Sequence, residues 1–162
     1  MNKTFLNVLY ELWILVFTAV LFGAFTYQIE LHHEPCPLCM LQRGGMIAAA
    51  FAPLLNRMYG TKHTHFGVGM LGSIFGLLVS SRQILLNVCS PVPYEEPVFG
   101  LQLFTWAYIV QICSLVATAV FLFIAEEDSE PKPLNRISWT IFGLLGFVTF
   151  ANIITSYIRL VG

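Results

Sequence analysis

The chain reads LWILVFTAVLFGAFTYQI at residues 12–29, between Glu11 and Glu30, without a single Asp, Glu, Lys or Arg. An α-helix needs about 18 to 20 apolar residues to cross the hydrocarbon core of a bilayer. Residues 97–125 and 137–158 form two further charge-free runs that are at least as long. The three runs predict three transmembrane helices. The first run is longer than the apolar core of a cleaved signal peptide and no A-x-A site follows it, so we expect a retained helix.

The composition agrees with a membrane protein. Hydrophobic residues make up 57% of the 162 residues and charged residues only 10%, whereas an average soluble domain is about 25% charged. A single small domain has too little interior to hide that much apolar surface from water. The net charge of -1 gives no electrostatic attraction to a phosphate backbone. These values exclude an ordinary soluble enzyme, a disordered chain and a nucleic-acid binder.

Two shorter apolar runs, at residues 44–56 and 66–81, complete the pattern. At about 1.5 Å per residue the first run is too short to span alone, so its helix must begin near Cys39 and include Arg43. The second run spans only if Arg82 lies within its helix, near one interface. We therefore predict an all-α integral membrane protein with a single domain over residues 1–162. Its five transmembrane helices are expected at about 6–29, 39–58, 66–88, 99–125 and 137–160.

Lysine and arginine are unevenly divided between the two sides of the predicted membrane. The side of the N-terminus has Lys3, Arg57, Lys62, Lys132 and Arg136. The other side has Arg43, Arg82 and Arg159. Because short loops rich in Lys and Arg stay in the cytoplasm, we expect a cytoplasmic N-terminus. The segments HHEPCPLC at 32–39 and CSPVPYEEP at 89–97 then face outward, as in a bacterial inner-membrane protein whose cysteines face the oxidising periplasm.

Two of the four cysteines form the motif Cys36-Pro37-Leu38-Cys39 at the start of the second predicted helix. Residues three and four positions apart share one face of a helix, so Cys36, Cys39 and Arg43 line one stripe. A helix N-terminus and a guanidinium group both favour thiolate over thiol, which quickens exchange. Pro37 stiffens the start of the helix. The motif is therefore interpreted as a redox-active dithiol.

The motif has two other interpretations. A purely structural disulfide has the same spacing. A zinc site normally needs four ligands, and here only His32 and His33 are close enough to join Cys36 and Cys39. A second Cys-x-x-Cys or a His-x₃₋₅-His is absent from the sequence nearby. The redox interpretation is favoured over both.

Arg43 is the second candidate site residue. An arginine at the edge of a membrane span, with no carboxylate in its own helix, is costly and is by default a functional candidate. The alternative is that its side chain reaches out to the lipid headgroups. The functional interpretation is an electrostatic anchor for a thiolate or for an anionic state of a cofactor.

The two remaining cysteines differ in depth. Cys89 ends the third predicted helix on the same side as the Cys-x-x-Cys motif, and it is a candidate third redox thiol. Cys113 lies about 20 Å along the fourth helix, where we expect a small apolar core residue. This difference in depth argues against a disulfide between Cys89 and Cys113.

Cys-Pro-Leu-Cys followed by Gln42-Arg43, then Ser81-Arg82-Gln83 late in the third span and Phe99-Gly100-Leu101 before the fourth, resembles the DsbB family of membrane disulfide-bond-forming oxidoreductases. The resemblance implies a four-helix transmembrane bundle in the inner membrane, here with a fifth, C-terminal transmembrane helix. It also implies a quinone-dependent protein-disulfide oxidoreductase, which reoxidises a DsbA-like soluble thiol oxidase of the thioredoxin fold and passes the electrons to ubiquinone or menaquinone.

By the same resemblance, Cys36 and Cys39 correspond to the redox pair next to the quinone, and Arg43 to the arginine that interacts with it. Cys39 is nearer the membrane and is expected to contact the quinone ring, whereas Cys36 exchanges with another thiol. Family members usually have a second cysteine pair in the second outward loop. In this chain Cys89 stands at about the first of those positions and no second cysteine follows in the loop.

Several alternatives therefore stay open. The soluble thiol attacks the Cys36–Cys39 disulfide directly, or Cys89 pairs with Cys36, or Cys89 has no redox role. The fifth helix packs on the bundle or mediates association through Gly143 and Gly146. Two other functions use the same residues. One is a metal-binding membrane module with Cys36, Cys39 and His32 or His33, and the other is a reductase that moves electrons outward.

Overall fold

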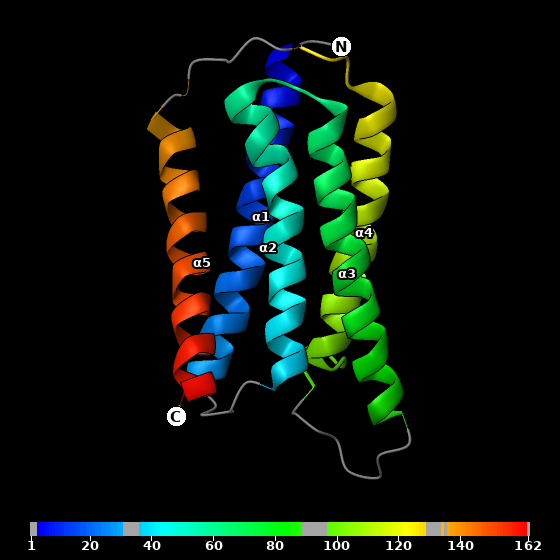
Figure 1. Ribbon diagram of the computed structural model, residues 1–162, viewed down its shortest axis with the longest axis vertical. Helices are drawn as coiled ribbons and strands as arrows, with labels where there is room; N and C mark the ends of the chain where they lie inside the picture. The colour runs from blue at the N-terminus through cyan, green and yellow to red at the C-terminus, as the bar shows by residue number, and fades with distance from the viewer. Residues whose placement is uncertain (1–2, 31–35, 89–96, 129–133, 135, 162) are drawn as a thin grey trace.

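The computed structural model describes residues 3–30, 36–88, 97–128, 134 and 136–161, and these residues form five long α-helices (Figure 1). The helices are α1 (Lys3–Glu30), α2 (Pro37–Tyr59), α3 (His63–Asn87), α4 (Leu103–Ile124) and α5 (Arg136–Val161). All five are long and apolar enough to cross a membrane. The predicted all-α membrane fold with a fifth C-terminal helix is confirmed.

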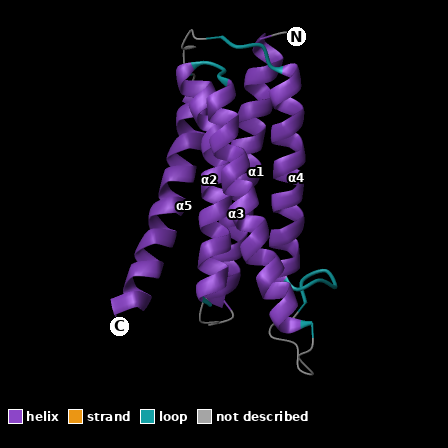
Figure 2. Ribbon diagram, turned by 45° about the vertical axis from the view of Figure 1, so that its right-hand side comes forward, coloured by secondary structure: helices purple, strands orange, loops and turns teal. Residues whose placement is uncertain are grey.

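The helices run up and down along one axis, so successive helices are antiparallel (Figure 1 and Figure 2). α2 packs against α3 most extensively, α3 against α4, and α1 against both α2 and α5. The start of α2, the end of α3 and the start of α4 lie at the same end of the bundle (Figure 1). The topology therefore brings the Cys-x-x-Cys motif and the segment before α4 to one end.

The start of α4 differs from the prediction. The expected helix began at residue 99, but α4 begins at Leu103. Before it, the backbones of Val98 and Leu101 exchange hydrogen bonds of 2.9 and 3.2 Å across a tight turn. Phe99 and Gly100 occupy the centre of this turn with φ angles of 51° and 81°, values that an α-helix does not allow. The indole N–H of Trp106 donates to the Val98 carbonyl at 2.9 Å and ties the turn to α4.

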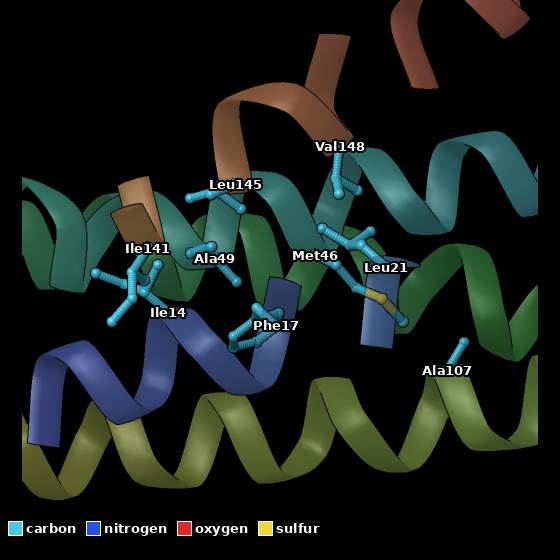
Figure 3. Packing of buried hydrophobic residues seen from close by; sticks show 10 residues of the cluster. Ile14, Phe17, Leu21, Met46, Ala49, Ala107, Ile141, Leu145 and Val148 are labelled. Atoms are coloured by element: carbon cyan, nitrogen blue, oxygen red, sulfur yellow. The ribbon is translucent and has the colours of Figure 1, made fainter. Parts of the chain in front are cut away.

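The main apolar core lies between α1, α2, α4 and α5 (Figure 3). It contains Ile14, Phe17, Leu21, Met46, Ala49, Ala50, Ala107, Ile141, Leu145 and Val148. α5 enters this core through Ile141, Leu145 and Val148, which share one face because they are four and three positions apart. Built Cβ atoms at Gly143 and Gly146 would meet nothing within 4 Å. The fifth helix therefore packs on the bundle through its aliphatic face.

The contact between α2 and α3 depends on small residues. A Cβ built on Gly72 would lie 2.7 Å from the Cβ of Ala48, and one on Gly69 would lie 2.6 Å from the Cβ of Ala52. Real Cβ atoms do not approach so closely, so only glycine fits at these two positions of α3. Association of helices in lipid relies on such close van der Waals packing, because burial from water does not drive it.

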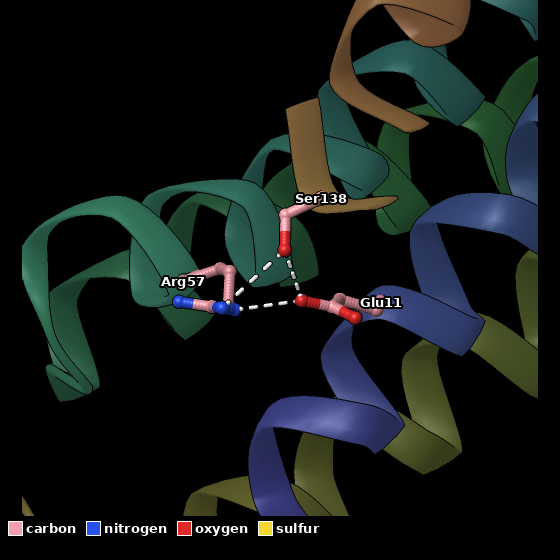
Figure 4. Close-up of polar contacts among 3 residues, drawn as sticks. All are labelled: Glu11, Arg57 and Ser138. Carbon is pink, nitrogen blue, oxygen red and sulfur yellow. Dashed lines mark hydrogen bonds and ion pairs between the residues drawn. The ribbon is translucent and has the colours of Figure 1, made fainter. Parts of the chain in front are cut away.

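A polar cluster ties α1, α2 and α5 together near the end of the bundle opposite the cysteines (Figure 4). Arg57 Nε lies 2.9 Å from Glu11 Oε1, and the two side chains are 6% and 16% exposed. Arg57 Nη2 also donates to Ser138 Oγ at 3.3 Å. The Ser138 hydroxyl in turn donates to Glu11. The cluster is a nearly buried ion pair with a hydroxyl shared between the partners.

Candidate functional site

The cysteine motif forms the N-terminus of α2. Cys36 is the N-cap residue with extended backbone angles, and Pro37 occupies the first helical position. The Cys39 N–H donates to Cys36 Sγ at 3.1 Å, so the sulfur satisfies a backbone donor that the helix leaves open. The Sγ atoms of Cys36 and Cys39 lie 2.6 Å apart. The two sulfurs are therefore in direct contact, as closure of a disulfide requires.

Two glutamines adjoin the sulfur pair. Gln83 on α3 is 3% exposed, and its Nε2 lies 3.5 Å from Cys36 Sγ and 3.4 Å from Cys39 Sγ. Gln42 on α2 donates to Gln83 Oε1 at 2.7 Å. Both glutamines belong to sequence motifs, Gln42-Arg43 and Ser81-Arg82-Gln83, whose pattern alone predicted no role for either amide. The signal that points to them is an amide side chain inside a membrane span, where an unsatisfied polar group is costly.

Arg43 lies one turn deeper along α2 than Cys39 and is 8% exposed. Its Nη1 donates to Gln28 Oε1 at 2.6 Å and to Asn152 Oδ1 at 3.3 Å. Its Nη2 donates to the Ala24 carbonyl at 3.0 Å. The guanidinium is thus held inside the bundle by α1 and α5, which argues against extension to the lipid headgroups.

A cavity of about 450 Å³ lies between α1, α2 and α4, and Val98 and Phe99 of the turn before α4 also line it. Cys39, Gln42 and Arg43 contribute to its α2 wall. The remaining wall is apolar or aromatic, and it consists of Val20, Gly23, Ala24, Tyr27, Met46, Leu103, Phe104, Trp106, Ala107 and Val110. An apolar cavity with a few polar groups on one side is typical of a small-molecule site.

These walls suit the membrane quinone that the resemblance of the sequence motifs predicts. A quinone has an apolar ring and tail, which the aliphatic and aromatic walls suit, and two carbonyl oxygens that accept hydrogen bonds. The Arg43 guanidinium and the Gln42 amide supply donors in the same cavity. Cys39, rather than Cys36, belongs to the wall.

The remaining candidates have different outcomes. Cys89, His32 and His33 lie outside the described residues. Within the described ranges, no three His, Cys, Asp or Glu side chains gather as metal ligands. The expectation that Cys113 is a core residue is wrong, because its side chain is exposed on the surface of α4. The buried face of that helix is instead formed by Phe104, Ala107, Gln111, Ser114 and Thr118.

The sequence of the chain is similar to those of known proteins. The family model for the disulfide bond formation protein DsbB matches residues 7–158. Disulfide bond formation protein B of Ralstonia nicotianae (strain ATCC BAA-1114 / GMI1000) is 31% identical over 102 residues. That alignment covers 57% of this chain and 64% of the relative, so the chain matches a little under two thirds of the relative's length. No solved structure matched the chain. With a family match over all five helices, the chain belongs to the DsbB family of disulfide bond formation proteins.

Proposed function

We propose that this chain is a membrane protein-disulfide oxidoreductase that takes electrons from a soluble thioredoxin-fold dithiol protein and passes them to a membrane quinone. One observation carries the proposal. Cys39 lies in the wall of an apolar cavity between α1, α2 and α4, while Cys36, in contact with it, caps α2 at the end of the bundle. This arrangement supports a role for Cys39 next to an apolar electron acceptor and for Cys36 in exchange with a thiol.

The exchange begins at Cys36. A thiolate of the soluble protein forms a bond to Cys36 Sγ, the bond between Cys36 and Cys39 breaks, and the electron pair leaves on Cys39 Sγ. The second thiolate of the soluble protein then attacks that protein's first sulfur, which is bonded to Cys36, and Cys36 leaves as a thiolate. The soluble protein leaves with a disulfide, and its two electrons remain on the Cys36 and Cys39 sulfurs.

The cavity residues serve the second half of the reaction. When bound, a quinone accepts two electrons and two protons, the number that two thiols give up when they form a disulfide. Arg43 places a positive charge in the cavity wall, where it stabilises negative charge that develops near Cys39. Its contacts with Gln28, Ala24 and Asn152 fix the guanidinium in advance. The apolar wall suits an apolar ring next to the reacting sulfur.

Position in the cell is part of the proposal. The excess of Lys and Arg on the side of the N-terminus supports an inner-membrane protein whose cysteine end faces the periplasm. The sequence predicts that Cys89 lies on the same side as the Cys36–Cys39 pair. We assign it the role of an auxiliary redox thiol, which substitution tests separately from the Cys36–Cys39 pair.

Trapping of mixed disulfides tests the proposal in native membranes. In Cys39→Ser, Cys36 is a thiol that attacks the disulfide of an oxidised thioredoxin-fold substrate, so one substrate sulfur bonds to Cys36 and the other leaves as a thiol. Because the neighbouring thiol that would release Cys36 is absent, this covalent complex should accumulate. Cys36→Ser should trap little, and neither variant should oxidise a substrate that is supplied in its reduced form. Cys113→Ser is the matched control, because this exposed cysteine on α4 lies away from the pair, and it should oxidise the substrate normally. Substrate oxidation that survives Cys39→Ser would refute the proposal.

The same assay resolves the role of Cys89. Cys89→Ser should slow transfer from the soluble protein if the thiol participates, while quinone-dependent reoxidation of a chemically reduced Cys36–Cys39 pair should continue. An unchanged rate of transfer would assign the whole exchange to Cys36.

A further inference from the structure

Gln83 is the buried polar side chain that contacts both redox sulfurs. It reaches them from α3, a helix other than the one that carries the cysteines. Its single amide nitrogen has two N–H groups, and it lies 3.5 Å from Cys36 Sγ and 3.4 Å from Cys39 Sγ. One nitrogen thus has a donor for each sulfur. Cys39 Sγ also lies 3.8 Å from Gln83 Oε1, which can accept from the thiol form.

The orientation of this amide is set by a second glutamine. Gln42 Nε2 donates to Gln83 Oε1 at 2.7 Å, which identifies Oε1 as the acceptor and leaves the amino group for the sulfurs. Gln111 on α4 has its Nε2 3.5 Å from the backbone carbonyl of Gln42. All three glutamines are at least about 95% buried. Gln83 therefore contacts the sulfurs, Gln42 contacts Gln83, and Gln111 contacts the backbone of Gln42.

N–H donors next to Cys39 Sγ change the balance between its thiol and thiolate forms. A sulfur in an apolar environment disfavours the thiolate form, and an N–H aimed at it favours the charged form over the neutral one. The Cys39 backbone N–H is occupied with Cys36 Sγ. The amide of Gln83 supplies a side-chain donor 3.4 Å from Cys39 Sγ.

We propose that Gln83 is a catalytic residue of the cysteine pair. Its amide donates a hydrogen bond that stabilises the thiolate formed on Cys39 Sγ when another thiolate attacks Cys36, and Gln42 positions that amide. The inference rests on the proposed function. During exchange the new bond forms at Cys36 and the old bond breaks at Cys39, so negative charge develops on the sulfur that Gln83 faces. Stabilisation of this thiolate also favours the reduced pair and makes its disulfide a stronger oxidant.

The test uses the full chain with Cys36, Cys89 and Cys113 replaced by serine, so that Cys39 is its sole thiol. The rate of alkylation of Cys39 by iodoacetamide at pH 7 measures its thiolate fraction, whether or not the protein is an oxidase. Gln83→Met keeps the length of the side chain and removes both donors. It should slow alkylation about tenfold, because a hydrogen bond to a charged group has an effect of that size.

Three further variants separate donation from simple packing. Gln83→Glu should not restore the rate, because a carboxylate repels a thiolate, whereas a purely structural role predicts rescue by this isosteric polar residue. Gln42→Met should produce a smaller loss, because it removes only the group that orients Gln83. Ser80→Ala is the matched control, since Ser80 is a fully buried polar residue one turn earlier on α3. In this variant the rate of Cys39 alkylation should be unchanged. Arg43 and Arg82, the nearby charges on α2 and α3, are retained throughout.

A second readout uses the native pair. In glutathione buffers, Gln83→Met should shift the equilibrium between Cys36 and Cys39 about tenfold toward the disulfide. An unchanged alkylation rate in Gln83→Met, or full rescue in Gln83→Glu, would overturn the inference and leave the proposed function standing. Failure of the parent protein to oxidise any thiol would instead refute the proposed function, while the alkylation result would still report on the contact.

Discussion

Arg43 on α2 donates a hydrogen bond of 3.3 Å to the side-chain oxygen of Asn152 on α5, 109 positions later in the chain. The Asn152 amide nitrogen donates to the Val148 carbonyl on its own helix at 2.8 Å, which fixes the direction of the oxygen. The fifth helix thus holds the arginine that lines the cavity, together with Gln28 on α1. α5 is therefore connected to the candidate site as well as to the apolar core.

Replacement of Asn152 by leucine tests this connection. Polar contacts between membrane helices are worth about 0.6 to 1.7 kcal/mol, so the apparent affinity for a short-chain quinone analogue should fall about three- to twentyfold. Thiol exchange at Cys36 should be unaffected. Thr155→Val is the control on the same helix, because the Thr155 hydroxyl donates only to the Ala151 carbonyl of α5. Equal quinone kinetics in Asn152→Leu and the parent protein would show that α5 does not act on Arg43.

The nearly buried ion pair between Glu11 and Arg57 should make a large contribution to the stability of the helix bundle at the end opposite the cysteines. Removal of one partner leaves the other charge isolated, so Glu11→Gln or Arg57→Met alone should lower the free energy of unfolding by about 3–5 kcal/mol. The double variant should recover much of this loss, because it leaves no isolated charge. Thermal unfolding in detergent measures the effect.

The matched control for this prediction is an exposed pair. His63 Nδ1 lies 3.0 Å from Glu127 Oε1, with side chains that are 49% and 58% exposed. Glu127→Gln should change the stability by less than about 1 kcal/mol. Equal losses at Glu11 and Glu127 would contradict the assignment of a buried pair.

The helices could be predicted from the sequence because each is marked by a local run of apolar residues, and even Arg43 and Arg82 fell inside helices as expected. The start of α4 was missed because the turn at Phe99 depends on backbone angles that the apolar pattern does not reveal.

The contacts of the candidate site were harder to predict. The pairs formed by Arg43 with Asn152 and by Cys39 with Gln83 join helices 109 and 44 positions apart. Local spacing says which residues share a face of one helix, but it does not say which helix that face meets. Cys113 illustrates the same limit, since its place within a helix long enough to span a membrane was predictable and the exposure of its side chain was not.

The glycine contacts between α2 and α3 yield a third prediction. A Cβ on Gly72 would lie 2.7 Å from both Ala48 Cβ and the Ala49 backbone nitrogen, so Gly72→Ala must push the helices apart. Such overpacking should lower stability by about 1–3 kcal/mol. Gly143→Ala on α5 meets nothing within 4 Å and should be neutral or slightly stabilising, because alanine favours helix over glycine. A loss of stability in Gly143→Ala equal to that in Gly72→Ala would show that the effect comes from the backbone and not from the contact.

The cavity itself can be tested by filling it from a glycine in its wall. Gly23 on α1 lines the cavity, and a Cβ built there meets nothing within 4 Å. Gly23→Leu therefore adds volume at the cavity without a clash at its first atom, and it should compete with a bound quinone. A steric cost of about 1–3 kcal/mol predicts a loss of quinone affinity of roughly five- to 150-fold. Titration of reoxidation rates with short-chain ubiquinone and menaquinone analogues measures this loss.

Gly44→Leu is the matched control for Gly23→Leu. A Cβ on Gly44 also meets nothing within 4 Å, and the residue lies on α2 next to Arg43, but it is not part of the cavity wall. Both variants replace a helical glycine by leucine, so any general effect on helix stability or membrane insertion is shared. Only Gly23→Leu should weaken quinone use, and mixed-disulfide formation at Cys36 should proceed in both. Equal quinone kinetics in the two variants would mean that the quinone binds elsewhere, because a leucine side chain cannot occupy the cavity and leave room for an unchanged ring.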